Sequence, residues 1–219
     1  MRSVAIDAEG SRIFTGGHEK KLRLFDLNRA DADATNFITG GGSTAHEGNI
    51  KSVVWQRSHG QRSVVSAGED KVVRWWDLRS GQVSHEMSFS DPIVSMERSF
   101  IAPLGGETLT IASGKRLLFL DLETHSIHKE FSDLPQPPPS SASLHPGKAN
   151  TFITGSTSDG WVRIYDYATG QEKELHKGHH GPAHILSYSP DGELAASGSE
   201  DGTIRLWQTT PGKKYGLWV

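Results

Sequence analysis

The chain has 219 residues, of which 35% are hydrophobic, 24 are glycine and 10 are proline. Its 23 basic and 26 acidic side chains give a formal charge of −3, a balance that argues against electrostatically driven binding of nucleic acid. The absence of cysteine excludes disulfides and thiolate metal sites.

One unit recurs five times along the chain. Each copy has an apolar run, a tight polar turn, and a second apolar run that ends in an aromatic residue and usually an acid. The second runs end at 26, 77, 121, 166 and 208, so the spacings are 51, 44, 45 and 42 residues. A period of this size predicts a stacked repeat architecture. We place the units at about 1–40, 46–90, 91–132, 140–176 and 178–219, within a single domain.

Each unit contains runs typical of four short strands, rich in Val, Ile and aromatic residues and separated by turn residues. In chain order they are 4–6, 12–17, 22–27 and 35–40; 50–55, 62–68, 71–78 and 82–89; 93–98, 108–113, 116–122 and 126–131; 141–145, 151–156, 161–167 and 171–176; 184–189, 194–199, 204–209 and 214–219. Four-stranded sheets arranged radially are the blades of a β-propeller, so we predict an all-β fold of five four-stranded blades. No amphipathic helix of ten or more residues is found.

Turns and one loop complete this organisation. The pairs Asp159-Gly160, Asp191-Gly192 and Asp201-Gly202 predict turns with a positive φ at glycine. Residues 133–142 (DLPQPPPSSA) carry four prolines and predict a loop between the third and fourth units. A polyproline ligand for another domain is the alternative reading of that loop, but a connector between blades is favoured.

The fifth unit carries the pattern of a known family. It contains Gly178-His179, then SPDGE (189–193) and ASGSEDGTIRLW (196–207), and in this it resembles the WD-repeat family. In that family a buried hydrogen-bonded tetrad joins a loop His, a strand Ser or Thr, a turn Asp and a strand Trp. The resemblance assigns these roles to His46, Ser66, Asp70 and Trp76 in the second unit and to His179, Ser197, Asp201 and Trp207 in the fifth.

The other three units match this tetrad only in part. The first has Thr15, Glu19 and Phe25, the third lacks the turn acid, and the fourth has Thr154, Asp159 and Tyr165 with one extra turn residue. We expect these blades to depend on packing. A basic residue stands three positions before the end of the second run in four units, which predicts exposed strand positions with local acid partners. These residues are Arg23, Arg74, Arg163 and Arg205.

A narrower resemblance covers the whole chain. The order of complete and degenerate units, the SASLHP and YDY segments, and the terminal GKKYGLW are similar to the family of serine-threonine kinase receptor-associated proteins, also called unr-interacting proteins. That family is a seven-bladed propeller, so the resemblance implies its C-terminal five blades. Five blades of a seven-bladed ring predict an open arc with exposed sheet faces, and a closed ring of five blades is the alternative.

The sequence gives little support for a metal site or an enzyme active site. The histidines 179, 180 and 184 form a cluster, but Gly181-Pro182 interrupts it and His179 already has a tetrad role, so no metal is expected. No phosphate-binding loop or nucleophile elbow is present. We therefore expect no enzymatic activity and no cofactor.

The resemblance implies a protein-interaction scaffold. Its expected partners are subunits of the survival-of-motor-neuron (SMN)–gemin complex, in spliceosomal snRNP assembly and mRNA splicing, with receptor kinase signalling as a further role. The alternative is the propeller subunit i of translation initiation factor three. Tyr215, Leu217 and Trp218 are either a closing strand or a partner-docking tail.

The cellular setting follows from the same observations. No stretch approaches about 18 consecutive apolar residues, and the N-terminal segment lacks the pattern of a signal peptide. We therefore expect no membrane association, and the charge balance predicts no direct contact with nucleic acid. A cytoplasmic and nuclear location is what the family resemblance implies.

Overall fold

The computed structural model describes residues 2–29, 35–37, 44–56, 63–132, 134 and 137–210. These residues form five antiparallel sheets, each built from strands that are consecutive in the chain. We call the sheets blades 1 to 5 in chain order. Four blades have four strands, and blade 5 has three among the described residues. Its predicted fourth strand, 214–219, lies outside them.

The strand bounds agree with most of the predicted runs. Blade 1 has β1 (Ser3–Ile6), β2 (Arg12–Gly16), β3 (Leu22–Asp26) and β4 (Thr35–Phe37), and blade 2 has β5 (Ile50–Gln56), β6 (Ser63–Gly68), β7 (Val72–Asp77) and β8 (Gln82–Ser88). Blade 3 has β9 (Ile93–Ile101), β10 (Gly106–Ser113), β11 (Arg116–Asp121) and β12 (Ile127–Phe131). Blade 4 has β13 (Pro139–Leu144), β14 (Thr151–Ser156), β15 (Trp161–Asp166) and β16 (Glu172–Lys177), and blade 5 has β17 (Ala183–Tyr188), β18 (Leu194–Ser199) and β19 (Ile204–Gln208). The predicted all-β propeller is confirmed.

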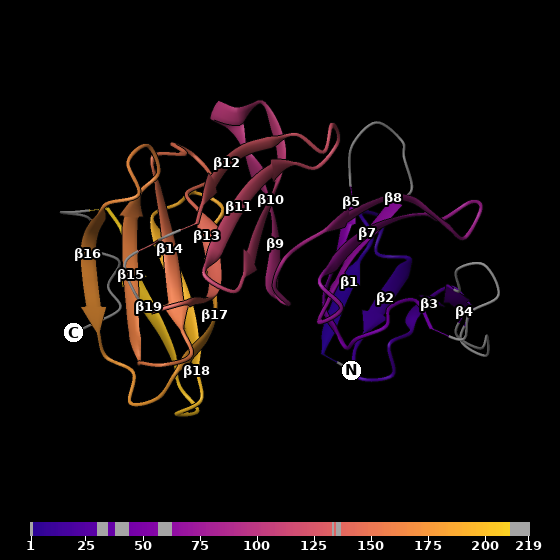
Figure 1. The fold of residues 1–219 in the computed structure, drawn as a ribbon, viewed down its shortest axis with the longest axis horizontal. Helices are drawn as coiled ribbons and strands as arrows, with labels where there is room; N and C mark the ends of the chain where they lie inside the picture. Colours follow the sequence, from indigo (N-terminus) through magenta and orange to yellow (C-terminus); the bar gives the residue numbers. More distant parts are fainter. Residues whose placement is uncertain are drawn as a thin grey trace.

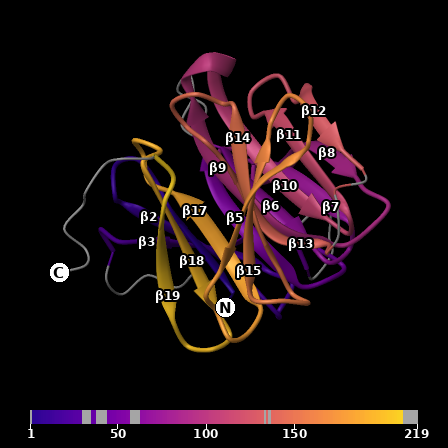
Figure 2. The same ribbon diagram turned by 90° about the vertical axis from the view of Figure 1, so that its left-hand side faces the viewer.

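The blades stand side by side in chain order around a common centre. Their first strands line that centre, and each contacts the first strand of the next blade, from β1 through β5, β9 and β13 to β17. Figure 1 shows blades 1 and 2 on the right, blades 4 and 5 on the left and blade 3 joining them above. Figure 2 shows β17, β18 and β19 at the near end of this series.

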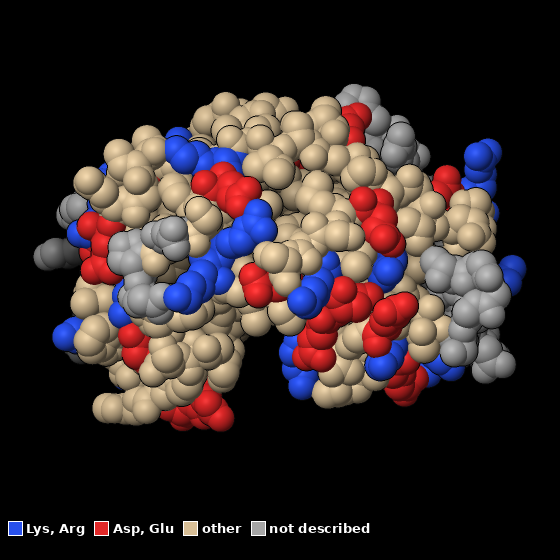
Figure 3. All heavy atoms as spheres, in the orientation of Figure 1, with Lys and Arg blue, Asp and Glu red and all other residues tan. Residues whose placement is uncertain are grey.

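The arc is open between its first and last blades. No contact comparable to those between neighbouring first strands joins β17 to β1 among the described residues. Figure 3 shows the corresponding notch along the lower edge of the molecule. The end faces carry exposed apolar side chains, Val4 and Ile6 in blade 1 and Ile185 and Ile204 in blade 5. These faces match the expected open arc, while the number of blades in a complete ring stays a prediction.

The hydrophobic core is divided into layers between neighbouring blades. Trp76 and Phe14 lie in the layer between blades 1 and 2, and Trp75 lies in the layer between blades 2 and 3. Phe119 and Phe152 meet between blades 3 and 4, with ring centroids 5.4 Å apart. Because each strand alternates its side chains between two faces, an inner blade supplies residues to two layers at once.

The first strands of blades 2 to 5 share an irregularity that the sequence did not reveal. Each has a register shift near its start, where one extra residue of the first strand displaces its pairing with the second strand by one position. A β-bulge of this kind twists the strand locally. The residues beside the shift are small in the partner strands, namely Ala67, Ala112, Gly155 and Gly198.

Two sequence expectations about the backbone are wrong in part. The loop predicted over 133–142 ends early, because β13 begins at Pro139, which pairs with Ser156. Proline is tolerated as the first residue of a strand, and here β13 is buried throughout. Gly192 and Gly202 have the predicted positive φ, but Gly160 does not. Gly160 is needed for space instead, since a Cβ there would lie 2.5 Å from the carbonyl oxygen of His179.

The remaining differences are small. β9 extends to Ile101, three residues beyond the predicted run, and a short 3₁₀ helix, η2 (Ala102–Leu104), links it to β10. No helix among the described residues is long and apolar enough to cross a membrane.

Candidate functional site

The four predicted tetrad residues of blade 2 form one hydrogen-bonded chain. The Trp76 indole N–H donates to Ser66 Oγ at 2.8 Å. Ser66 Oγ lies 2.7 Å from His46 Nε2, and His46 Nδ1 lies 2.9 and 3.0 Å from the two carboxylate oxygens of Asp70. With a neutral imidazole, the chain is complete when Ser66 donates to Nε2 and the Nδ1–H donates to Asp70.

Asp70 is the charged end of this chain. It also accepts the backbone N–H of Glu47 at 3.1 Å and Arg74 Nη1 at 2.8 Å. Burial disfavours its charge, but the hydrogen bonds from His46 and Arg74 outweigh burial and hold the pKa of Asp70 far below its usual range. The carboxylate therefore stays ionised and ties the loop before β5 to the turn between β6 and β7.

Blade 5 brings together its own four predicted residues with one addition. Trp207 Nε1 donates to Ser197 Oγ at 2.7 Å, and His179 Nε2 lies 2.6 Å from the same oxygen. His179 Nδ1 lies 3.3 Å from Asp201 Oδ2 but 3.0 Å from Thr203 Oγ1, which in turn donates to Asp201 Oδ1 at 2.6 Å. Thr203, which the sequence reading missed, thus bridges His179 and Asp201.

The three degenerate blades use other contacts at the same places. In blade 1, Arg23 pairs with Glu19. In blade 3, Ser113 Oγ donates to the backbone oxygen of Asp91 at 2.8 Å. In blade 4, Arg163 Nη2 donates to Asp159 Oδ2 at 2.7 Å. These three blades thus have polar contacts in addition to the packing expected from the sequence.

Three of the four repeated arginines have the predicted local acid partners, but none of the four is fully exposed, contrary to the expectation from the sequence. Arg205 is the exception in pairing, because its Nε is shielded from solvent and has no hydrogen-bond partner among the described residues. Arg74 pairs with Asp70 and with Glu86 at 2.8 Å, and Arg163 pairs with Asp159 and with Glu172 at 3.5 Å. Arg163 is buried, with 6% of its surface exposed. Each of these two side chains lies across its sheet between a turn carboxylate and a carboxylate of the fourth strand. Such pairing compensates the cost of removing the charge from water.

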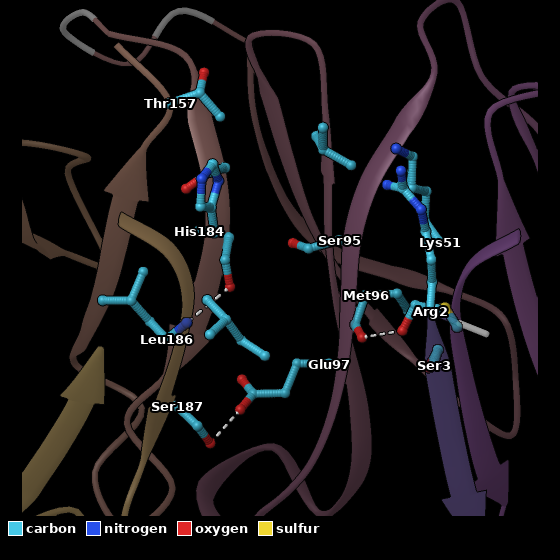
Figure 4. A pocket seen from close by; sticks show the side chains of 15 residues that line it. Arg2, Ser3, Lys51, Ser95, Met96, Glu97, Thr157, His184, Leu186 and Ser187 are labelled. Atoms are coloured by element: carbon cyan, nitrogen blue, oxygen red, sulfur yellow. Dashed lines mark hydrogen bonds between the residues drawn. The ribbon is translucent and has the colours of Figure 1, made fainter. Parts of the chain in front are cut away.

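A cavity of about 840 Å³ occupies the centre of the arc (Figure 4). It is lined by the first strands of all five blades, and serine predominates on them. Several of these hydroxyls join neighbouring blades: Ser3 Oγ accepts the Val53 N–H at 2.9 Å, and Ser52 Oγ donates to the Met96 carbonyl at 2.7 Å. A Ser hydroxyl at these positions lets the strands approach closely and still satisfies a backbone group.

The other expected sites have plain outcomes. Tyr215, Leu217 and Trp218 lie outside the described residues, so their docking role stays a prediction. The described residues contain no group of three or more metal-ligating side chains. His184 lies 3.6 Å from Glu200, and His179 belongs to the blade 5 tetrad. The sequence did not single out Glu97, the one acidic side chain among the described residues that line the cavity.

Comparison with known proteins agrees with this geometry. The family model described as "WD domain, G-beta repeat" matches residues 35–77 and 170–208. The chain is 40% identical to serine-threonine kinase receptor-associated protein of Gallus gallus and 38% identical to that of Homo sapiens, over 100% of this chain and 57% of each relative. It is 42% identical to the Dictyostelium discoideum protein of the same name, over 95% of this chain and 66% of that protein.

A solved structure shows the same fold. The WD40 β-propeller domain of Doa1 superposes with a TM-score of 0.73 at 20% identity, over 96% of this chain and 65% of that one. The chain spans just over half the length of the vertebrate relatives that it matches.

Proposed function

This chain is a WD-repeat protein, and we propose that it acts as a non-enzymatic protein-interaction scaffold within an SMN–gemin complex that assembles spliceosomal snRNPs for mRNA splicing. The observation that carries this proposal is the 38–42% identity, along essentially the whole chain, to proteins named serine-threonine kinase receptor-associated protein. WD-repeat propellers are generally interaction platforms, because a rigid ring of sheets holds variable loops on two faces and a rim.

The described site supports a scaffold rather than a catalyst. The polar residues that recur in blades 2 and 5 are occupied with one another, from Trp76 through Ser66 and His46 to Asp70 and in the matching blade 5 chain. A side chain whose hydrogen bonds are all used to hold loops is not available to a substrate. These tetrads position the loops that a partner would contact.

The proposed partners are gemin or SMN-complex proteins, and RNA would then be an indirect partner. The near-neutral composition supports indirect RNA contact, because a chain with a formal net charge of −3 has no general attraction for phosphate. The proposed location is cytoplasm and nucleus. The name of the relatives refers to a kinase receptor, and a receptor-signalling role is proposed for this chain on that similarity.

The test is affinity purification of the endogenous protein, tagged at Val219, followed by mass spectrometry. Gemin and Sm proteins among the enriched partners would support the assembly role. Enrichment of initiation-factor subunits would overturn it in favour of translation, the alternative that the sequence left open. Recovery of no specific partner at all would overturn the scaffold proposal itself.

A further inference from the structure

The first strands of the five blades present equivalent positions to the central cavity. Ser3, Ser52, Ser95, Ser141 and Ile185 each pair with the small residue beside the bulge or at the strand end, so they form one layer. Two residues further along lies a second layer, and its members are Ala5, Val54, Glu97, Ser143 and Ser187. Glu97 is the only member of either layer that can carry a charge.

Most hydroxyls in these layers are used to join neighbouring blades. Ser141 Oγ accepts the Leu186 N–H at 3.2 Å and Ser143 Oγ accepts the Tyr188 N–H at 3.1 Å. Ser95 differs, because its Oγ is shielded from solvent and has no hydrogen-bond partner. The Ser95 hydroxyl on β9 is therefore unsatisfied, whereas the equivalent serines on the other first strands are hydrogen-bonded.

Glu97 is the second unsatisfied group on β9. Its Oε1 accepts the Ser187 hydroxyl at 2.6 Å, across the cavity from blade 3 to blade 5 (Figure 4). Its Oε2 is shielded from solvent and has no hydrogen-bond partner. Burial, opposed by the Ser187 and Ser143 hydroxyls, raises the pKa of Glu97 to about 7. The carboxyl is thus desolvated at Oε2, and no cation among the residues that the structure describes pairs with it.

The other charged residues on the cavity wall have partners of their own. Lys51 Nζ lies 2.6 Å from Glu69, and His184 lies 3.6 Å from Glu200. Arg2 Nε donates to His18 at 3.0 Å and lies within electrostatic reach of Glu69. No described cation pairs with Glu97, which leaves one unpaired negative group among the described residues of the cavity wall.

We propose that the central cavity binds an arginine side chain of a partner protein segment, with its guanidinium paired to Glu97 and hydrogen-bonded to Ser95. A guanidinium carries five N–H donors in a planar fork and no acceptor, so it suits two neighbouring acceptors on one strand. Binding requires Glu97 to turn from Ser187 toward the cavity and Ser95 to change rotamer, because Ser95 Oγ and Glu97 Oε2 are both shielded from solvent. The ion pair then replaces the interactions of Glu97 with the Ser187 and Ser143 hydroxyls. The volume of about 840 Å³ exceeds one side chain and admits the flanking peptide.

The inference rests on the proposed scaffold role and names the chemistry that a partner must present. It does not depend on which complex the protein joins. Isothermal titration calorimetry would use three peptides that differ at one position, acetyl-Gly-Gly-Arg-Gly-Gly-amide and its citrulline and lysine counterparts. Citrulline keeps the shape of arginine without the charge, so it isolates the ion pair.

The expected result is binding of the arginine peptide at least about tenfold tighter than binding of the citrulline or lysine peptide. Glu97→Gln should abolish this preference, while Ser95→Ala should weaken arginine binding severalfold. Glu130→Gln removes a carboxylate from the outer strand β12, where Glu130 pairs with Arg116, and should leave the preference intact. Affinity should rise from pH 6 to pH 8 as Glu97 ionises.

Three outcomes would overturn the proposal: equal affinity for the arginine and citrulline peptides, equal affinity for the arginine and lysine peptides, or an unchanged preference in a folded Glu97→Gln variant. The same variant in the affinity purification separates the two proposals. If wild type and Glu97→Gln capture the same partners, the cavity site is wrong and the scaffold stands. If wild type captures none, the scaffold is wrong, whatever the peptides do.

Discussion

The Ser66 hydroxyl accepts the Trp76 indole N–H at 2.8 Å and lies 2.7 Å from His46 Nε2, so one side-chain oxygen satisfies two buried groups. Ser197 stands in the same relation to Trp207 and His179. In both blades this serine lies at the middle of the chain that links the inner loop to the third strand. Removing this hydroxyl would leave the indole N–H and the imidazole without a hydrogen-bond partner. Substituting the serine therefore tests the chain more directly than substituting a residue at either end of it.

Ser66→Ala should destabilise the fold by about 1–3 kcal/mol, because the Trp76 N–H and the His46 nitrogen would both be buried without a partner. Urea unfolding followed by tryptophan fluorescence measures this change. Ser84→Ala is the control, since the Ser84 hydroxyl makes one hydrogen bond of 3.2 Å to the Trp75 carbonyl at a position open to solvent. An equal effect of the two substitutions would contradict the central role of Ser66.

Asp70 predicts a particular response to acid. Its pKa in the folded chain is depressed below the ordinary 3.8, so its stabilising effect is present above about pH 4 and is lost as the pH falls through the folded pKa. Asp70→Asn should lower the melting temperature at pH 7 and should flatten the loss of stability between pH 4 and pH 2. Melting curves across this range test both points. Asp26→Asn at an exposed turn serves as the control, and an acid limb as steep in Asp70→Asn as in wild type would contradict the assignment.

The repeated unit allowed the fold to be predicted because the signal is local and occurs five times. The offsets from Ser66 to Asp70 and from Asp70 to Trp76 recur in blade 5, and the structure brings both sets of residues together. Degenerate blades were harder. No spacing rule in the sequence indicates that Arg163 is buried between Asp159 and Glu172, because this depends on the neighbouring fourth strand.

The cavity could not be predicted for a physical reason. Glu97 and Ser187 are 90 positions apart, and only the packing of five first strands around one centre brings them within 2.6 Å. A faint signal existed: Glu97 occupies a place that holds Val54 in blade 2 and Ser143 in blade 4. An acidic residue at an otherwise uncharged position of an inner strand is a departure from the repeat, and such departures mark candidate functional positions.

Gly68→Ala should disrupt the blade 2 tetrad without removing any of its members. A Cβ at Gly68 would lie 2.6 Å from Asp70 Oδ1 and 2.8 Å from His46 Nδ1, so the substitution must displace the pair. We expect a destabilisation of about 1–3 kcal/mol, the range for overpacking a well-packed site. Gly106→Ala is the matched control, because its Cβ would meet only Asp121 Oδ2 at 3.7 Å. Thermal melts that fall equally in both variants would show that the effect is not specific to the tetrad.

Glu97→Gln should stabilise the protein at high pH. The folded pKa of about 7 lies above the ordinary 4.5, so the folded state loses stability as the pH rises from about 4.5 through 7. This loss is on the order of 3 kcal/mol when complete. The glutamine carries no charge, so its melting temperature should exceed that of wild type by several degrees at pH 8 and match it near pH 5. A difference that is the same at both pH values would show that ionisation of Glu97 is not its cause.

The open face of blade 5 makes a prediction about self-association. Ile185, Gly198 and Ile204 form one cross-strand row, and the two isoleucines are 66% and 79% exposed. No described blade covers this row, and an exposed apolar row on an unpaired sheet face favours contact between molecules. Because Ile204 is mostly exposed, it buries little apolar surface when the chain folds. Ile204→Lys should therefore leave the melting temperature nearly unchanged.

The lysine should nevertheless reduce association between molecules, because it places a charge on a surface that association would bury. Sedimentation velocity over a range of protein concentrations measures this. Ile127→Lys is the matched control: Ile127 is 49% exposed on the outer strand β12, away from both ends of the arc. Wild type and Ile127→Lys should show the same rise of average mass with concentration, and Ile204→Lys should show a smaller rise. Identical behaviour of all three proteins would mean that the exposed face of blade 5 does not drive association.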